Sequence, residues 1–495
     1  MNDECKKNLH LHMNFSCQLT TNAACRGTRG NDRQFGVLRT CLERCNCETM
    51  QAIPSSRDPL MNNANWLQRS LASVWHPCTQ MKRHEQLPLL PIARGEGAWL
   101  YDFDGKRYLD AVSSWWVNLF GHANPRINAA LKQQLDRLEH VMLAGFTHQP
   151  VVELSERLAA LTGLGHAFYG SDGASATEIA LKMSFHYWRN CGQAQKTGFV
   201  SLSNGYHGET LGALGVTDMA LFRDVYAPLL RPGLQLPCPD TRLAAPGESA
   251  HAFALRCAAA AEQQLAQVHL TTAALIVEPL VQGATGMAMY HPVYLQRLRE
   301  LCDRYRIHLI ADEIAVGFGR TGTLFACEQA GIRPDLLCLS KGITGGYLPL
   351  SAVLSRDEIY AAFYDDEVTR GFLHSHSYTG NALACRAALT VLDIFVDDNV
   401  LERNRQRAAQ LTALLQPLAG HSRVRNFRNT GMIWAFEVAD APHDFASRAF
   451  HQALDRGVLL RPIGNTVYFM PPYVIDAEQM QLLADCALAI VNAPA

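Results

Sequence analysis

Residues 291–312, HPVYLQRLRELCDRYRIHLIAD, contain the pattern that decides the fold. Residues 291–306 repeat apolar side chains at the spacing of one helical face. These side chains are Leu295, Leu298, Leu301, Cys302 and Tyr305. The apolar run IHLIA (307–311) follows, and a similar run, AALIV (273–277), precedes the helix. A strand, a helix and a second strand in this order predict an α/β fold with a largely parallel sheet.

The pattern continues towards the C-terminus. LLCL (336–339) and SAVL (351–354) are further short apolar runs of the same series. Past about residue 395, long helices rich in Arg, Gln and Ala give way to short strands such as GMIWAFEV (431–438), which predicts a second, smaller α+β domain. The expected parts are a segment outside the fold (1–60), the N-terminal part of the small domain (61–115), a large domain (116–390) and the C-terminal part of the small domain (391–495).

Residues 1–60 differ in composition from the rest. They are rich in Asn, Thr, Cys and Arg and show no sustained apolar period. Met61 opens MNNANWLQRSLASVWHPCTQM, in which Trp66, Leu67 and Leu71 have helical spacing. We expect residues 1–60 to be a leader outside the core or a misassigned start, with Met61 as the initiator in the second case.

Composition narrows the function classes. The chain has 495 residues, 48% of them hydrophobic, with 44 Lys and Arg against 46 Asp and Glu. This balance gives no electrostatic reason to expect binding to nucleic acid or to an anionic membrane. The 15 cysteines lack repeated metal-ligand spacing, and no run approaches the ~20 apolar residues of a membrane span. We expect a cytoplasmic protein that acts on small molecules and holds no metal.

An acid and a lysine follow two of the expected strands. Asp312 comes directly after IHLIA, and Lys341 comes one residue after LLCL. Ligands of such sheets collect at the carboxyl ends of the strands. Together, these two groups supply what pyridoxal phosphate needs, namely an amine that forms a Schiff base with its aldehyde and a carboxylate that keeps its pyridine nitrogen protonated. The alternative for each residue alone is a surface lysine and a helix-capping aspartate.

Two further segments fit the same cofactor. GSDGASATEIALKMSFHYW (170–188) is a turn of small residues that leads into a helix, where the amides of Gly173, Ala174 and Ser175 are placed to bind a phosphate. Such a turn is also a common helix cap. In NGYHGETLGAL (204–214), Tyr206 follows the apolar run FVSL and is placed to stack on a flat ring, although buried aromatic residues usually only pack.

The phrases SDGASATE, NGYHGET, VEPLVQGATG, ADEIAVGFGRTG and SKGITGGYLPLSAV resemble, in this order, the class III (ω-type) aminotransferases of fold type I, over about residues 61–495. The resemblance implies that Lys341 binds the cofactor covalently, Asp312 pairs with the pyridine nitrogen and Tyr206 stacks on the ring. It also implies that Gly173 and Ala174 bind the phosphate. His376 and Ser377, in HSHSYTGN, correspond to a segment that reaches the phosphate of the other subunit, so a homodimer with shared sites is implied.

Within the family, VWHPCTQM, SSWW and RPIGNTVYFMPPY are similar to phrases of the members that move the amino group of S-adenosylmethionine to 8-amino-7-oxononanoate in biotin synthesis. This resemblance places Trp115 and Arg461 in the substrate pocket, with Ser375, Tyr206 and Lys341 as further substrate contacts. Arg461 would hold the acceptor carboxylate with its two-pronged guanidinium. Tyr468 lies close to Arg461 in the sequence and is expected to line the same pocket.

Two departures bear on the substrate. Many ω-aminotransferases carry a glutamate that neutralises this arginine when the other substrate binds, and Gly283 stands at that position here. Cys78 stands where some members of the group carry a pocket tyrosine. The alternatives are an ornithine, acetylornithine or other ω-amino acid aminotransferase, or a nucleotide-binding module that uses GFGRTG. The last motif lacks the GK[ST] ending of a phosphate-binding P-loop.

Overall fold

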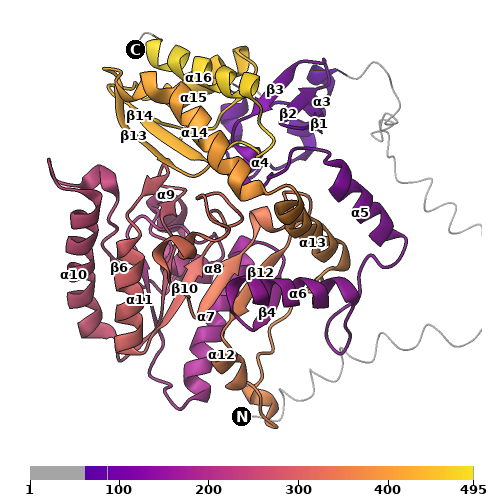
Figure 1. Ribbon diagram of the computed structural model, residues 1–495. Helices are drawn as coiled ribbons and strands as arrows, with labels where there is room; N and C mark the ends of the chain where they lie inside the picture. The colour runs from indigo at the N-terminus through magenta and orange to yellow at the C-terminus, as the bar shows by residue number, and fades with distance from the viewer. Residues whose placement is uncertain (1–61, 86, 88, 494–495) are drawn as a thin grey trace, which may run out of the picture. The chain divides into compact units, whose positions relative to one another are not determined.

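The computed structural model describes residues 62–85, 87 and 89–493. A seven-stranded sheet with the strand order β4-β12-β11-β10-β7-β5-β6 lies at its centre (Figure 1). The strands are β4 (His166–Gly170), β12 (Ser351–Ser355), β11 (Leu336–Leu339), β10 (His308–Asp312), β7 (Thr272–Val277), β5 (Gly198–Leu202) and β6 (Leu234–Leu236). The five strands from β11 to β6 run parallel, which confirms the predicted α/β class.

The expectation that SAVL continues the parallel series is wrong in direction. This segment forms β12, which pairs antiparallel with both β11 and β4. Only residues 340–350 connect β11 to β12. A parallel crossover needs a dozen or more residues, so the chain returns beside β11 in the opposite direction.

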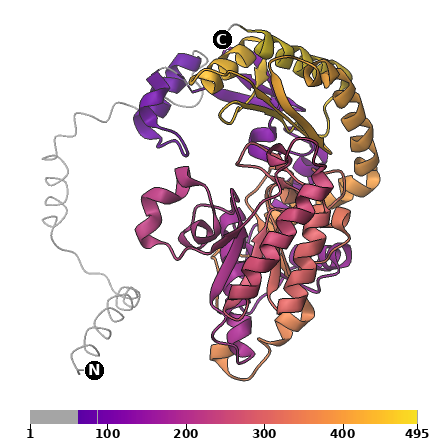
Figure 2. The same ribbon diagram turned by 90° about the vertical axis from the view of Figure 1, so that its left-hand side faces the viewer.

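Side chains alternate between the two faces of the sheet. Helix α7 (Gly173–Asn190) packs on the face that carries Ile276, Ile310 and Cys338. On the other face, Leu275 and Leu309 lie in one core cluster with α10 (Ala250–Val268) and α11 (Val293–Tyr305). Leu337 and Leu339 lie in another core cluster with α13 (Ala382–Asp397). Figure 2 shows α10 and α11 side by side, as their contacts also indicate.

The last part of the chain forms a smaller α+β arrangement. Its antiparallel sheet has the order β13-β14-β16, with β13 (Val424–Thr430), β14 (Ile433–Val438) and β16 (Thr466–Phe469). The helices α14 (Val400–Ala419), α15 (Phe445–Asp455) and α16 (Ala477–Asn492) accompany it. A second sheet pairs β15 (Val458–Leu459) with β3 (Arg107–Asp110), so early residues lie beside late ones. The domain boundaries at 115 and 390 stay predictions.

The remaining elements are short or lie between these layers. The strands are β1 (Ile92–Glu96), β2 (Trp99–Asp102), β8 (Val281–Gln282) and β9 (Ala288–Met289). The helices are α3 (Asn63–Ser73), α4 (Ser113–Trp116), α5 (Pro125–Leu135), α6 (Gln149–Thr162), α8 (Leu211–Val216), α9 (Ala220–Arg223) and α12 (Asp357–Ala361). The 3₁₀ turns are Met81–Glu85, Asp224–Leu229, Thr241–Leu243, Ala326–Ala330, Lys341–Thr344 and Val368–Arg370.

The helix expected after Met61 is present as α3, and the side chain of Asn62 caps it by accepting a hydrogen bond from the Asn65 amide. The predictions for residues 1–60 and for Met61 as initiator lie outside the described residues. In the described part of the chain, no helix is long and apolar enough to span a membrane.

Candidate active site

The predicted cofactor residues gather at the carboxyl edge of the parallel strands. Asp312 ends β10, and Lys341 follows β11 after one residue. Tyr206 lies in the loop after β5, and Gly173 starts α7 shortly after β4. In parallel α/β sheets this edge is the ligand-binding edge.

Lys341 has an enclosed amine that opens on a small cavity. A cavity of about 340 Å³ is lined by Lys341 and by Ser171, Asp172 and Gly173 at the start of α7. Burial lowers the pKa of Lys341 to about 8, while the carboxylates of Asp312 and Glu278 act in the opposite direction. About a tenth of the amine is therefore neutral at pH 7, far more than for a lysine with the ordinary pKa, and the neutral form is the one that acts as nucleophile and base.

Asp312 is held by two hydrogen bonds. Its Oδ1 accepts from the amide of Ile314 at 3.1 Å, and its Oδ2 lies 2.7 Å from Nδ1 of His207. Both side chains are almost fully buried. Because a carboxylate only accepts, Nδ1 of His207 carries the proton of this bond. This pairing fixes the position of the carboxylate, which would hold a proton on a bound pyridine nitrogen.

The start of α7 has the features of a phosphate site. The side chain of Asp172 caps the helix at the Ser175 amide, at 2.8 Å. The preceding amides of Gly173 and Ala174 belong to the first helical turn, whose N–H groups have no partner within the helix. Gly208 approaches closely, because a Cβ atom there would lie 2.7 Å from the Cβ of Ala174. The loop that carries Tyr206 is therefore packed against this helix start.

Tyr206 is connected to a buried acid. Its amide donates to Oε1 of Glu278 at 2.9 Å, and its hydroxyl donates to Oε1 of Glu209 at 3.0 Å. Burial raises the pKa of Glu278 to about 7, and the charge of Asp312 adds to the shift while His207 opposes it. The thiol of Cys78 is exposed.

Trp115 and Trp116 lie in an unusual turn. Ser113, Ser114, Trp115 and Trp116 have φ values of 51°, 47°, 72° and 72°, so α4 is a left-handed turn without glycine. Each such residue costs roughly 1–2 kcal/mol. The turn brings the ring of Trp116 to 4.4 Å from Nζ of Lys341. Trp116 is thus a site residue that the sequence analysis did not assign.

Arg461 lies over the other tryptophan. Its guanidinium carbon is 4.3 Å from the centroid of the Trp115 ring, and both side chains are exposed. Among the carboxylates of residues 62–85 and 89–493, none forms an ion pair with Arg461. Tyr468, which was expected nearby, is buried and accepts a hydrogen bond from Nε1 of Trp116 at 3.2 Å. Burial raises its pKa to about 12.

His376 and Ser377 contact two other segments of the chain. Nδ1 of His376 lies 3.4 Å from the hydroxyl of Ser171, and the carbonyl of Ser377 accepts from Nε2 of His140 at 2.9 Å. Ser375 and Ser377 are exposed. The roles expected for Ser375, His376 and Ser377 stay predictions.

His207, which the sequence did not assign to the site, and Gly283, which it did single out, complete the arrangement. His207 lies 105 positions before Asp312, and no local pattern links them; the only signal is a histidine beside Tyr206 in the same loop. Gly283 lies against Trp116, because a Cβ atom at residue 283 would be 2.9 Å from the indole ring. GFGRTG is a structural loop, since its Arg320 is buried and donates to the carbonyls of Pro471 and Asn118 at 2.9 Å.

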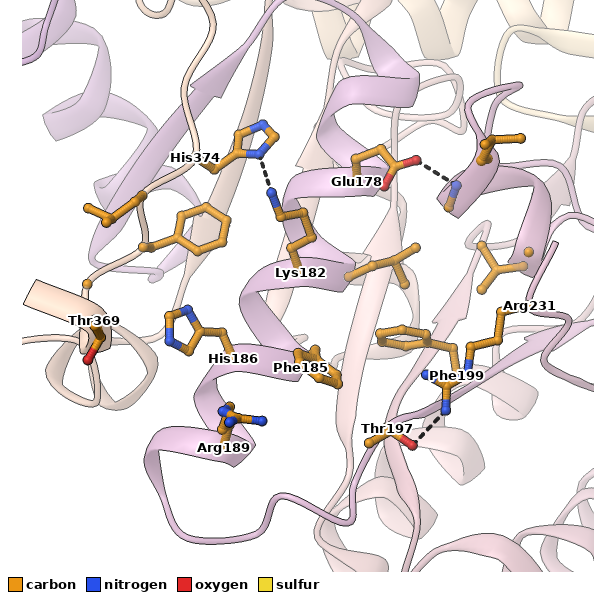
Figure 3. Close-up of a pocket in the computed structure, with 18 residues that line it drawn as sticks. Glu178, Lys182, Phe185, His186, Arg189, Thr197, Phe199, Arg231, Thr369 and His374 are labelled. Carbon is orange, nitrogen blue, oxygen red and sulfur yellow. Dashed lines mark hydrogen bonds between the residues drawn. The ribbon is translucent and has the colours of Figure 1, made fainter. Parts of the chain in front are cut away.

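A larger cavity of about 690 Å³ lies elsewhere and is lined by residues of α7, α8, β5 and the segment 369–374 (Figure 3). Glu178 and Lys182 of α7 point into it, and Lys182 meets His374 at 2.8 Å. None of the residues predicted to bind the cofactor lines this cavity. The chemistry of the lining therefore identifies the site better than cavity size.

The residues at the smaller cavity fit pyridoxal phosphate. They offer an amine with a lowered pKa and a helix start that both line the cavity, together with a buried carboxylate at the same edge of the sheet. Lys341 would hold the aldehyde carbon, Asp312 the pyridine nitrogen, and Gly173 and Ala174 the phosphate. When bound, this cofactor supplies an electron-withdrawing ring that stabilises negative charge on a substrate carbon.

Known proteins are similar to this chain in sequence and in fold. The model of the class-III aminotransferase family matches residues 80–491. The adenosylmethionine-8-amino-7-oxononanoate aminotransferase of Helicobacter pylori is 48% identical over 420 residues, which cover 83% of this chain and 94% of the relative. The crystal structure of the enzyme of that name from Methanocaldococcus jannaschii has a TM-score of 0.82 at 34% identity and covers 87% of this chain and 99% of its own.

A structure with the cofactor is similarly close. The PLP-bound amine transaminase from an uncultivated Pseudomonas species has a TM-score of 0.80 at 34% identity, with 85% of this chain and 98% of that chain covered. The family and its cofactor agree with the lysine, the aspartate and the phosphate turn described above. The chain belongs to the class-III aminotransferases and is a pyridoxal-phosphate-dependent transaminase of fold type I.

Proposed function

We propose that this transaminase moves the amino group of S-adenosylmethionine to 8-amino-7-oxononanoate, giving 7,8-diaminononanoate for biotin synthesis. The support that carries this proposal is the identity of 48% to the Helicobacter pylori enzyme that bears this name. Similar relatives from Geobacter sulfurreducens and Anoxybacillus flavithermus carry the same name at 42% and 39% identity.

The residues of the pocket support the acceptor. Arg461 is an exposed guanidinium stacked on Trp115, ready to bind one carboxylate with two parallel hydrogen bonds. A glutamate at residue 283 would have to enter the space of the Trp116 ring. Arg461 therefore has no internal carboxylate to neutralise it, which suits an acceptor that presents one carboxylate far from its reacting ketone.

The reaction proceeds in two half-reactions of ping-pong type. In each, the neutral amine of Lys341 would move a proton between the substrate carbon and the carbon that forms the cofactor's aldehyde, in one direction or the other. Asp312 would hold the proton on the pyridine nitrogen of the bound cofactor, and His207 keeps Asp312 in position. Tyr206 and the two tryptophans exclude water and orient the substrates.

The second candidate is another class III ω-aminotransferase, since amine and ω-transaminases are close in structure. A coupled assay of purified protein with S-adenosylmethionine and 8-amino-7-oxononanoate, beside ornithine and a simple amine as donors or an ω-keto acid as acceptor, decides between them. The proposal expects the first pair to give the highest kcat/KM. Preference for ornithine or a simple amine would contradict it.

We also propose a homodimer in which Ser375, His376 and Ser377 of one subunit complete the phosphate and substrate sites of the other. The neighbouring segment supports this, since Tyr364, Val368 and Leu373 are 71–81% exposed and Tyr378 is 66% exposed. Mixing Lys341→Ala subunits with Ser377→Asp subunits should restore about a quarter to a half of the activity per site if sites are shared between subunits. No restoration on mixing would contradict shared sites.

We propose a cytoplasmic location for the enzyme. The nine cysteines in the described part of the chain are all free thiols, which persist in a reducing compartment. Fractionation of cells that express the chain tests this proposal, and recovery of the activity outside the cytoplasmic fraction would contradict it.

A further inference from the structure

We propose that Asp110, together with His122, holds the left-handed turn Ser113–Trp116 and thereby positions Trp115 and Trp116 for the acceptor. Asp110 is a positioning residue, because it acts through the turn. The assignment of the acceptor rests on the proposed function, whereas the effect on the turn itself does not.

Asp110 ends strand β3 and is completely buried. Its Oδ1 accepts a hydrogen bond from the amide of Ser114 at 2.9 Å, and its Oδ2 accepts from the Ser114 hydroxyl at 2.7 Å. Nε2 of His122 lies 3.0 Å from the same Oδ2. The carboxylate thus fastens both the backbone and the side chain of one residue in the centre of the turn.

The turn needs such fastening because its backbone is unfavourable. Four consecutive residues with side chains have positive φ, a conformation that only glycine adopts at no steric cost. Such strain persists where the surrounding structure over-determines it, and it concentrates at functional sites. Besides Asp110, the carbonyl of Met470 accepts from the Ser113 hydroxyl at 2.7 Å.

The result of this conformation is that two adjacent tryptophans serve two parts of the site. Trp116 turns inward to Lys341 and Gly283, and Trp115 lies under Arg461. In an extended strand, the two neighbouring tryptophans would point to opposite faces. In a right-handed turn, their side chains would leave the backbone in other directions than they do here. The left-handed turn therefore connects the place of the reaction to the place where the carboxylate binds.

His122 receives its own support. Its Nδ1 lies 3.1 Å from Nδ2 of Asn118, and the carbonyl of Asn118 accepts from the buried Arg320. With Nδ1 accepting, Nε2 carries the proton and donates to Asp110. Asn118 and His122, which follow the turn, are therefore connected by hydrogen bonds to the carboxylate of Asp110.

The main test replaces Asp110 with Asn, which keeps the volume and removes one acceptor and the charge. We expect KM for 8-amino-7-oxononanoate to rise about tenfold while kcat stays within about threefold, because the tryptophans lose their place but Lys341 does not. Trp115→Phe and Trp116→Phe first define how much of the near-UV circular dichroism of the substrate-free protein comes from these two tryptophans. Asp110→Asn should lose that part of the signal.

Asp102→Asn is the matched control. Asp102 ends the neighbouring strand β2, is also buried, and accepts from the amides of Asp104 and Lys106 at 3.1 and 2.8 Å. It fastens a turn at the other end of the hairpin. We expect this variant to lose thermal stability and to keep the wild-type KM. An equal rise of KM in both variants would mean a general loss of structure and would overturn the proposal.

A second pair of variants separates the effect of the Ser114–Asp110 hydrogen bond from the effect of the backbone strain. These variants also replace the main test if Asp110→Asn does not fold. Ser114→Ala removes the hydroxyl and keeps the cost of positive φ, whereas Ser114→Gly removes both. We expect the KM of Ser114→Ala to be about threefold higher than the KM of Ser114→Gly. In regular helices and strands the order is the reverse, because glycine is there the more damaging of the two residues. Ser114→Gly should also bring Asp110→Asn back to within about threefold of wild type.

The outcomes are distinct for the two claims. Wild-type circular dichroism and KM in Asp110→Asn, or a larger defect in Ser114→Gly than in Ser114→Ala, would overturn the role of Asp110. If the wild-type protein prefers another acceptor, the proposed function fails. The circular dichroism of the variants then still decides whether Asp110 holds the turn.

Discussion

The active site has two ends that differ in how the protein builds them. The lysine end, which comprises Lys341, Asp312 and His207, lies at the ends of parallel strands; its ionisable groups are enclosed, and Asp312 is paired with His207. The arginine end, which comprises Arg461 and Trp115, lies on irregular segments and is exposed. Both ends meet through Trp116, which touches the lysine end from the turn that carries Trp115.

This difference corresponds to two tasks. Proton transfer needs a fixed geometry and an amine whose pKa is close to the working pH, and burial supplies both. Recognition of a carboxylate needs a strong donor that solvent and substrate can reach, and exchange of two different substrates needs that donor to be released. We therefore expect changes at the lysine end to affect both half-reactions and changes at the arginine end to affect one.

The largest effect is expected from Lys341→Ala. Loss of the amine should lower the rate of both half-reactions by roughly 10³-fold or more, because no other group takes over the proton transfer. Single-turnover measurements of each half-reaction check this. A residual rate within about tenfold of wild type would remove Lys341 from its role.

Lys196→Ala is the control for this variant. Burial lowers the pKa of Lys196 to about 8 as well, but its amine donates to the carbonyls of Arg306 and Thr272 at 2.5 and 3.2 Å, at the amino end of β5. We expect this substitution to lower the melting temperature and to leave the half-reactions of the folded enzyme unchanged. If Lys196→Ala slowed the half-reactions as much as Lys341→Ala, the loss of activity would not be specific to Lys341.

The next effect concerns Asp312→Asn. An amide cannot hold the pyridine nitrogen protonated as a carboxylate does, and it leaves His207 without its charged partner, so both half-reactions should slow by about 100-fold, ~2.7 kcal/mol in the barrier. Stopped-flow traces of both half-reactions provide the measurement. A defect confined to one substrate would mean that Asp312 belongs to substrate binding.

The lowered pKa of Lys341 predicts how cofactor-free protein takes up pyridoxal phosphate. Only the neutral amine reacts, and with a pKa of about 8 its fraction rises about 30-fold from pH 6.5 to 9 and then levels off. A lysine with the ordinary pKa would instead gain about 300-fold over that range and still be rising. Uptake rates between pH 6.5 and 10 distinguish the two curves.

Much of the lysine end follows from local sequence. Asp312 and Lys341 come directly after apolar runs, and parallel strands place their carboxyl ends at one edge, so the pair could be predicted without coordinates. The link from His207 to Asp312 could not, because it joins two strand ends 105 residues apart. The antiparallel direction of β12 was missed because the length of a connection, and not the strand pattern, determines it.

The arginine end follows from sequence only through family resemblance. SSWW contains no glycine, and nothing in its residues predicts four positive φ values in succession. The conformation depends on Asp110, Met470 and Tyr468, which contact the turn from other segments. Local preference would have given an ordinary turn or strand, so tertiary contacts decide the position of both tryptophans.

The measurement that tests the division into two ends most directly is the separate timing of the two half-reactions in Arg461→Ala, with Arg461→Lys as the charge-retaining control. We predict that the apparent affinity for 8-amino-7-oxononanoate falls about tenfold in Arg461→Ala, and by a smaller factor in Arg461→Lys, because a point charge cannot replace a two-pronged donor. The half-reaction with S-adenosylmethionine should stay within about threefold of wild type. Unchanged affinity for the acceptor together with collapse of the donor half-reaction would contradict the account.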